Sequence, residues 1–120
     1  MVTNLKPDHE ILAELRKATV GLMYMSESDY PFETVMWEGD TEVTPPFLRG
    51  LTGESHDCPI EKTNCDVFLR GRHQNLASLL KTNLSDLKVY TVGRINMPVY
   101  IVGRSPEGNW LGLSTRVVQT

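Results

Sequence analysis

The sequence lacks the features that mark secreted, membrane-spanning and disulfide-rich proteins. Its 120 residues include only two cysteines, Cys58 and Cys65, and one pair cannot make the disulfide framework of a small secreted scaffold. The apolar runs are short, and the N-terminus has neither an apolar signal core nor a small-residue cleavage pattern. We therefore expect two free thiols, a cytoplasmic location and a single domain over residues 1–120, because this length supports one hydrophobic core.

The chain also lacks a recognised arrangement of catalytic or metal-binding side chains. Its histidines have no i, i+4 pair of the kind that binds a metal on a helix face, and we expect all three to lie at the surface: His9, His56 and His73. Ser26 and Ser28 have no neighbouring His or Lys to activate them. One alternative is a zinc site with two thiol and two imidazole ligands. Its residues would be Cys58, Cys65, His56 and His73, although their spacing matches no known pattern. The sequence otherwise predicts a protein that is not an enzyme and carries no cofactor.

Negative charge is concentrated in the first half of the chain. Residues 1–60 hold eleven Asp and Glu against four Lys and Arg, whereas residues 61–120 hold four against eight. The stretch 24–42 contains no Lys or Arg, and its acidic residues are Glu27, Asp29, Glu33, Glu38, Asp40 and Glu42. Acidic surfaces repel phosphates, and the positive residues of the second half are scattered singly, so direct binding to nucleic acid is disfavoured.

The acidic stretch suits a basic protein partner, because complementary potentials speed encounter and select among partners. Interleaved aromatic residues, which are common at interfaces, strengthen this interpretation: Tyr24, Tyr30, Phe32 and Trp37. We expect Trp37, on a strand, to belong to the core. A solvated acidic loop is the simplest alternative. Another is a metal-dependent hydrolase that binds Mg²⁺ or Ca²⁺ through carboxylates, although these do not have the spacing of an EF-hand. The carboxylates would be those of Glu27, Asp29, Glu33, Glu38 and Asp40.

Apolar periodicity predicts two main helices, over residues 7–20 and 73–84. A brief helix capped by Thr44 and a helical segment capped by Asn64 or Asp66 and interrupted at Gly71 are also expected. Residues 26–31 have turn chemistry. The expected strands are 34–37, 58–63, 88–95, 99–103 and 110–118.

The short links between the last three strands imply an antiparallel meander. The strand at 99–102 is apolar at every position and therefore needs cover on both faces. These patterns predict an α+β fold with a mostly antiparallel sheet, ending in a C-terminal β-meander covered by helices. The last strand is expected to reach Gln119 and Thr120, so that the terminal carboxylate and the Thr120 hydroxyl are held at the rim of the sheet.

Two blocks of sequence resemble the nuclease A inhibitor family. The first is Gly21-Leu22-Met23-Tyr24-Met25-Ser26-Glu27-Ser28-Asp29-Tyr30-Pro31-Phe32-Glu33, followed by Trp37-Glu38-Gly39. The second runs from Val89-Tyr90 through Val99-Tyr100-Ile101-Val102-Gly103 to Leu113-Ser114-Thr115-Arg116-Val117-Val118-Gln119-Thr120. The match covers most of the chain in order. One segment departs from the family pattern: a longer, acidic, aromatic-containing stretch before the last helix is replaced here by the short, basic segment 69–73.

The resemblance implies an α/β/α sandwich and a protein that inhibits a sugar-nonspecific DNA and RNA endonuclease of the metal-dependent ββα-metal type in a 1:1 complex. In that family, a glutamate and the C-terminal threonine enter the nuclease active site and address its catalytic metal. By the resemblance these roles fall on Glu27 and Thr120, with an interface rim at Ser26, Asp29, Glu33 and Glu38. The inhibitor holds no metal of its own and binds neither nucleic acid nor membrane. The alternative is a non-inhibitory interaction module of the same fold that docks another basic protein.

Overall fold

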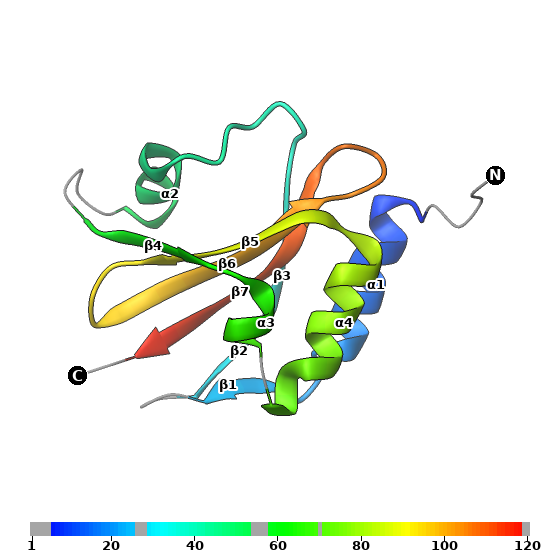
Figure 1. Cartoon of the computed structure of the whole chain (residues 1–120), viewed down its shortest axis with the longest axis horizontal. Helices are drawn as coiled ribbons and strands as arrows, with labels where there is room; N and C mark the ends of the chain where they lie inside the picture. Colours follow the sequence, from blue (N-terminus) through cyan, green and yellow to red (C-terminus); the bar gives the residue numbers. More distant parts are fainter. Residues whose placement is uncertain (1–5, 26–28, 54–57, 70, 119–120) are drawn as a thin grey trace.

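The computed structural model describes residues 6–25, 29–53, 58–69 and 71–118, which form helices and strands in the order shown in Figure 1. The helices are α1 (Asp8–Ala18), α2 (Pro45–Thr52), α3 (Cys65–Phe68), the 3₁₀ helix η1 (Gly71–His73) and α4 (Gln74–Asn83). The strands are β1 (Met23–Met25), β2 (Asp29–Pro31), β3 (Glu33–Trp37), β4 (Ile60–Thr63), β5 (Ser85–Val92), β6 (Asn96–Arg104) and β7 (Trp110–Val118).

Five of the strands form one sheet in the order β3-β7-β6-β5-β4, and each neighbouring pair is antiparallel. The meander β5-β6-β7 is the one predicted, and β7 has the predicted bounds. Strand β5 begins and ends about three residues earlier than expected. It ends at Val92 because Gly93, at φ +103°, starts the turn that leads into β6. The predicted α+β class and the antiparallel sheet are confirmed.

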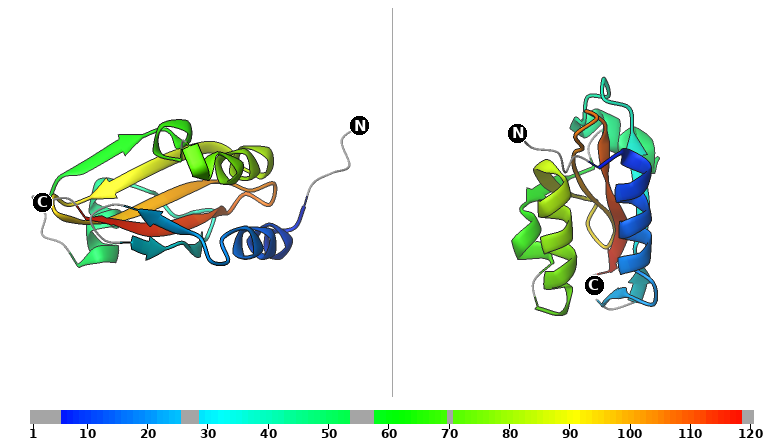
Figure 2. Two further views of the ribbon diagram at one scale, coloured as in Figure 1. Left: turned by 90° about the horizontal axis from the view of Figure 1, so that it is seen from below. Right: turned by 90° about the vertical axis from the view of Figure 1, so that its right-hand side faces the viewer.

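Helices pack against both faces of this sheet. Ile101 of β6 lies in the larger core cluster, with apolar residues of α1 and α4. The neighbouring Tyr100 points to the opposite face and packs in a second cluster, with Leu48 of α2 and Val92 of β5. Figure 1 shows α2 on one side of the sheet and α3 and α4 on the other, and Figure 2 shows α1 and α4 near the same end of the sheet. The predicted burial of the central strand on both faces follows from this arrangement.

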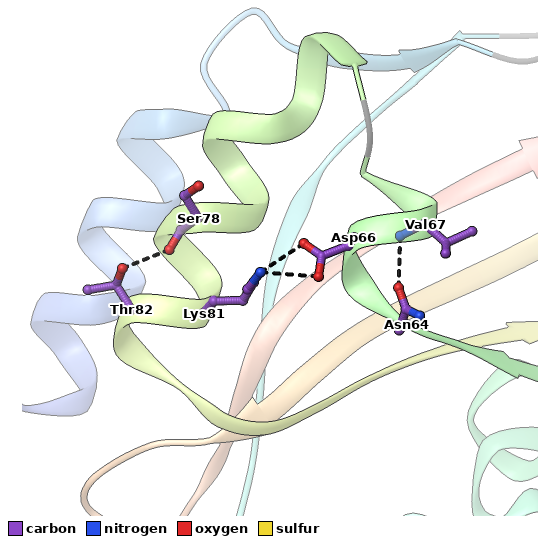
Figure 3. Close-up of polar contacts among 6 residues, drawn as sticks. All are labelled: Asn64, Asp66, Val67, Ser78, Lys81 and Thr82. Atoms are coloured by element: carbon purple, nitrogen blue, oxygen red, sulfur yellow. Dashed lines mark hydrogen bonds and ion pairs between the residues drawn. The ribbon is translucent and has the colours of Figure 1, made fainter.

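The short helices begin at the polar residues that the sequence indicated. The Thr44 hydroxyl accepts the backbone N–H of Phe47 at 3.3 Å, and the Asn64 side-chain oxygen accepts that of Val67 at 2.8 Å. Figure 3 shows the second cap beside an ion pair in which the Lys81 ammonium of α4 lies 2.9 Å from the Asp66 carboxylate of α3. The exposed ion pair therefore joins α3 to α4, whereas the cap stabilises the start of α3 itself.

The cap is expected to matter more for stability than the ion pair. The substitution Asn64→Ala leaves a helix N–H without its acceptor and should lower the free energy of unfolding by about 1 kcal/mol. The substitution Lys81→Ala breaks an ion pair whose side chains are more than half exposed, so its effect should stay below about 0.5 kcal/mol. Urea unfolding of both variants measures the difference, and an equal or larger loss for Lys81→Ala would contradict it.

Two local predictions are wrong. Residues 29–31, expected in a loop, form strand β2 and pair with β1. Tertiary contact overrides the turn chemistry here, because the Thr115 hydroxyl of β7 donates to the carbonyl of Pro31 at 3.0 Å. His73, expected at the surface, is only 5% exposed and lies among aromatic rings. Within the described part of the chain, no helix has the length and apolar character needed to cross a membrane.

Candidate protein-binding surface

The structure describes three of the residues predicted for an interface and separates one of them from the others. Asp29 begins β2 and Glu33 begins β3, whereas Glu38 follows the last residue of β3. All three are exposed. Because a strand rises about 3.3 Å per residue, Glu33 and Glu38 lie roughly 17 Å apart along the chain direction. Ser26, Glu27 and Thr120, together with the predicted terminal carboxylate, lie outside the described residues.

Strands β1 and β2 form a separate antiparallel pair, in which Met25 faces Asp29 and so brackets residues 26–28. This pair is fastened to the main sheet by the Thr115 hydroxyl, which also lies 3.4 Å from the carbonyl oxygen of Tyr30. Strand β7 continues to Val118, two residues before the end of the chain. Figure 1 shows β1 and β2 beside the C-terminal part of β7. The described residues next to both predicted contact segments are thus held by one set of hydrogen bonds.

An aromatic cluster of Tyr24, Phe32, Phe68 and His73 packs against the β1-β2 pair. The ring of Tyr24 stacks on Phe68 with centroids 4.4 Å apart and on His73 at 5.5 Å, and Phe32 meets His73 edge-on at 5.4 Å. Such pairs stabilise by about 0.5–1.5 kcal/mol each beyond their buried area. Tyr24 and Phe32 are therefore packing residues, which anchor the pair to α3 and to η1. The alternation of apolar and polar residues gave no signal of this cluster, because its members are far apart in the sequence.

Trp37 packs in the smaller core cluster, as expected for a strand residue. Its ring meets Phe47 of α2 at 5.0 Å and Tyr100 of β6 at 5.6 Å. Just beyond it, Gly39 is fixed by the Asn109 side chain, which accepts its N–H at 2.8 Å, and by Arg104, which donates to its carbonyl at 2.7 Å. Glu38 and Asp40, on either side of Gly39, are consequently held near the β6-β7 turn and away from β2.

The described residues do not assemble either of the metal sites considered from the sequence. Cys65 belongs to the core cluster beneath α1 and α4, whereas Cys58 belongs to the cluster beneath α2, on the other face of the sheet. Both are free thiols, as predicted, and His56 lies outside the described residues. Among the described ranges, no three His, Cys, Asp or Glu side chains gather as metal ligands.

The buried Cys65 thiol is expected to resist alkylation. Burial, aided by the charge of Asp66, raises its pKa from 9.0 to about 11, so only about one thiol in a thousand is ionised at pH 8. In the Cys58→Ser variant, iodoacetamide at pH 8 should modify the native chain about 100-fold more slowly than the urea-unfolded chain. Because the unfolded thiol ionises first, this group favours folding below pH 9, and the contribution is lost as the pH rises towards 11. Equal alkylation rates in the two states would contradict the burial.

A polar groove of about 190 Å³ lies between the β1-β2 pair and the main sheet. Its lining includes the side chains of Tyr30, Glu33, Pro98, Tyr100, Ser114 and Arg116. Glu33 faces Ser114, which faces Tyr100 on the next strand, so these three residues form one row across the sheet. Burial raises the pKa of the Tyr100 hydroxyl, and the charge of Arg116 partly opposes that rise. The hydroxyl is therefore a neutral hydrogen-bonding group at physiological pH.

The sequence did not predict this groove, although a signal for it was present. Ser114 and Arg116 are the polar positions of an alternating strand, and the charge of Glu33 lies at the start of another. Only the register of three strands and the packing of β2 against β7 bring them together.

Comparison with known proteins gives one family. The chain matches the family described as nuclease A inhibitor-like protein over residues 9–73 and 69–120. The two matched stretches overlap at residues 69–73, the segment that is expected from the sequence to depart from the family pattern. A search of curated proteins found no match. Because the matched residues cover most of the sequence, the chain belongs to the nuclease A inhibitor-like protein family.

Proposed function

We propose that the chain is a protein inhibitor of a sugar-nonspecific, metal-dependent DNA and RNA endonuclease and that it acts by blocking the active site. In this proposal, the Glu27 carboxylate and the Thr120 terminus address the catalytic metal of the nuclease in place of substrate phosphate. The inhibitor itself performs no catalysis and needs no cofactor. The complex contains one molecule of each protein.

One observation carries the proposal: the residues that flank Glu27 and the strand that leads to Thr120 are fastened together. Met25 pairs with Asp29, and the Thr115 hydroxyl of β7 binds the carbonyl of Pro31. The stacking of Tyr24 on Phe68 also fixes the β1-β2 pair against α3. An inhibitor that inserts two separate segments into one active site needs this kind of support, because ordering them on binding would cost affinity.

Charge supports the same function. The exposed carboxylates of Asp29 and Glu33 lie on either side of Pro31 and Phe32, next to the predicted contact segments. A nuclease cleft carries positive charge to attract phosphates, and carboxylates respond to the same field. We assign Ser26, Asp29 and Glu33 to the rim of the interface, and Glu38 to its far edge, since it lies at the other end of β3.

Titration of a purified ββα-metal nuclease with the wild-type chain tests the function. Cleavage of both DNA and RNA should fall linearly and stop at one inhibitor per nuclease when both proteins are far above the dissociation constant. A folded chain that leaves cleavage unchanged at tenfold excess would contradict inhibition. The basic segment 69–73 would then favour the other function, an interaction module that docks a different protein.

A further inference from the structure

We propose that the polar groove between β2 and the main sheet receives a cationic side chain of the nuclease, with the Glu33 carboxylate as its counter-charge. This inference rests on the proposed function and extends it from the metal-directed contacts to a second position on the same surface. The groove lies between β2, which follows the segment carrying Glu27, and the last residues of β7. The groove is therefore lined by described residues that lie close in sequence to both predicted contact segments.

The row of side chains across the groove suits an ammonium or guanidinium group. Glu33 supplies the charge, and the Ser114 and Tyr100 hydroxyls beside it can accept hydrogen bonds. Tyr30 and Tyr100 also line the groove, and a cation that lies within about 6 Å of a tyrosine ring face gains further attraction. The pyrrolidine rings of Pro31 and Pro98 provide apolar walls for the methylene part of a lysine or arginine.

Arg116 is close enough to form an ion pair with Glu33, but its guanidinium group contacts a different residue. It lies diagonally across from Glu33, because Glu33 faces Ser114 and Arg116 follows two residues later. Diagonal neighbours are about 7–8 Å apart, within reach of two long side chains. The Arg116 guanidinium instead donates to the Asn96 side-chain oxygen at 3.0 Å. Among the described residues, the Glu33 carboxylate has no ion pair or hydrogen bond, so it is available to a partner.

A cation bound in the groove and general attraction to an acidic surface predict different effects of neutralising Glu33 on the association and dissociation rate constants. Loss of a rim charge that stays solvated in the complex slows association and leaves dissociation nearly unchanged. Loss of one member of a partly desolvated, hydrogen-bonded charge pair speeds dissociation. The rate constant that changes on neutralising Glu33 therefore distinguishes the groove from general electrostatic attraction.

Surface plasmon resonance of the full-length chain with a purified ββα-metal nuclease provides the test. We expect Glu33→Gln to speed dissociation about 10-fold with less than a twofold change in association. Asp29→Asn, at the rim, should slow association and leave dissociation unchanged. Glu61→Gln, an exposed carboxylate on the opposite edge strand β4, is the matched control and should change neither rate.

A second variant tests the groove without relying on Glu33. Ser114→Arg fills the groove and places a guanidinium directly opposite Glu33, so it should speed dissociation at least 10-fold while thermal unfolding stays close to that of the wild type. The proposal is overturned if the wild type binds and neither Glu33→Gln nor Ser114→Arg changes dissociation. A wild-type chain that does not bind the nuclease overturns the proposed function together with this inference, so the two failures are distinguishable.

Discussion

Replacing Glu27 by alanine is expected to weaken inhibition of the nuclease by about 100-fold or more. Removing one partner of a buried, charged contact costs about 2–5 kcal/mol, because the opposite charge is left without its ligand. In the proposed complex, that opposite charge is the catalytic metal of the nuclease. The inhibition constant, measured from cleavage of a fluorescent oligonucleotide at several inhibitor concentrations, gives the effect directly.

The control for this substitution is Glu61→Ala, which removes an exposed carboxylate from β4 and should leave inhibition unchanged. Circular dichroism and urea unfolding establish that both variants fold. A chain lacking Thr120 should lose inhibition to a similar extent, because the terminal carboxylate is then carried by a different residue. Full inhibition by the folded Glu27→Ala variant would contradict the metal-directed role of Glu27.

The largest expected effect on stability comes from Gly112→Ala. A Cβ atom at this position would overlap the carbonyl oxygen of Ile101 and approach the Cα of Val102 to 3.0 Å. Gly112 faces Val35 on one side and Val102 on the other, so β7 cannot move away from β6 without disturbing β3. We expect the free energy of unfolding to fall by about 3 kcal/mol, the upper end for an overpacked core.

Gly50→Ala is the matched control, since it makes the same change in α2 at a place where a Cβ meets nothing within 4 Å. Alanine favours a helix over glycine by roughly 0.5–1 kcal/mol, so this variant should be as stable as the wild type or slightly more stable. Urea unfolding compares the two. A loss below about 1 kcal/mol for Gly112→Ala would show that β6 and β7 are not held as closely as the structure indicates.

Local chemistry predicted the elements whose cause lies within a few residues. Thr44 is expected as a helix cap, and Asn64 or Asp66 as a second one, because a short polar side chain can accept a nearby backbone N–H. In the structure Thr44 and Asn64 do so. The last strand, Trp110–Val118, follows from alternating side chains between two turn segments. The central strand was expected to need cover on both faces, and the two core clusters provide it.

The failures have a different cause, since they depend on contacts between distant residues. Tyr30 and Pro31 read as a turn, yet the Thr115 hydroxyl, more than 80 positions later, binds their carbonyls. The sequence pattern predicts His73 at the surface, but its ring packs against those of Tyr24 and Phe32. The groove beside Glu33 arises in the same way. Sequence patterns thus indicated the carboxylates of Asp29 and Glu33 as candidate interface residues, whereas the hydrogen bonds beside them became visible only in the structure.

Competition with nucleic acid tests the central claim, active-site blockade, most directly. Isothermal titration calorimetry would measure binding of the wild-type chain to the metal-loaded nuclease at increasing concentrations of a short phosphorothioate oligonucleotide, which resists cleavage while the catalytic metal stays in place. If inhibitor and substrate occupy one site, the apparent dissociation constant should rise in proportion to the oligonucleotide concentration. A dissociation constant that does not change with oligonucleotide would contradict the account, because it would place the chain outside the active site.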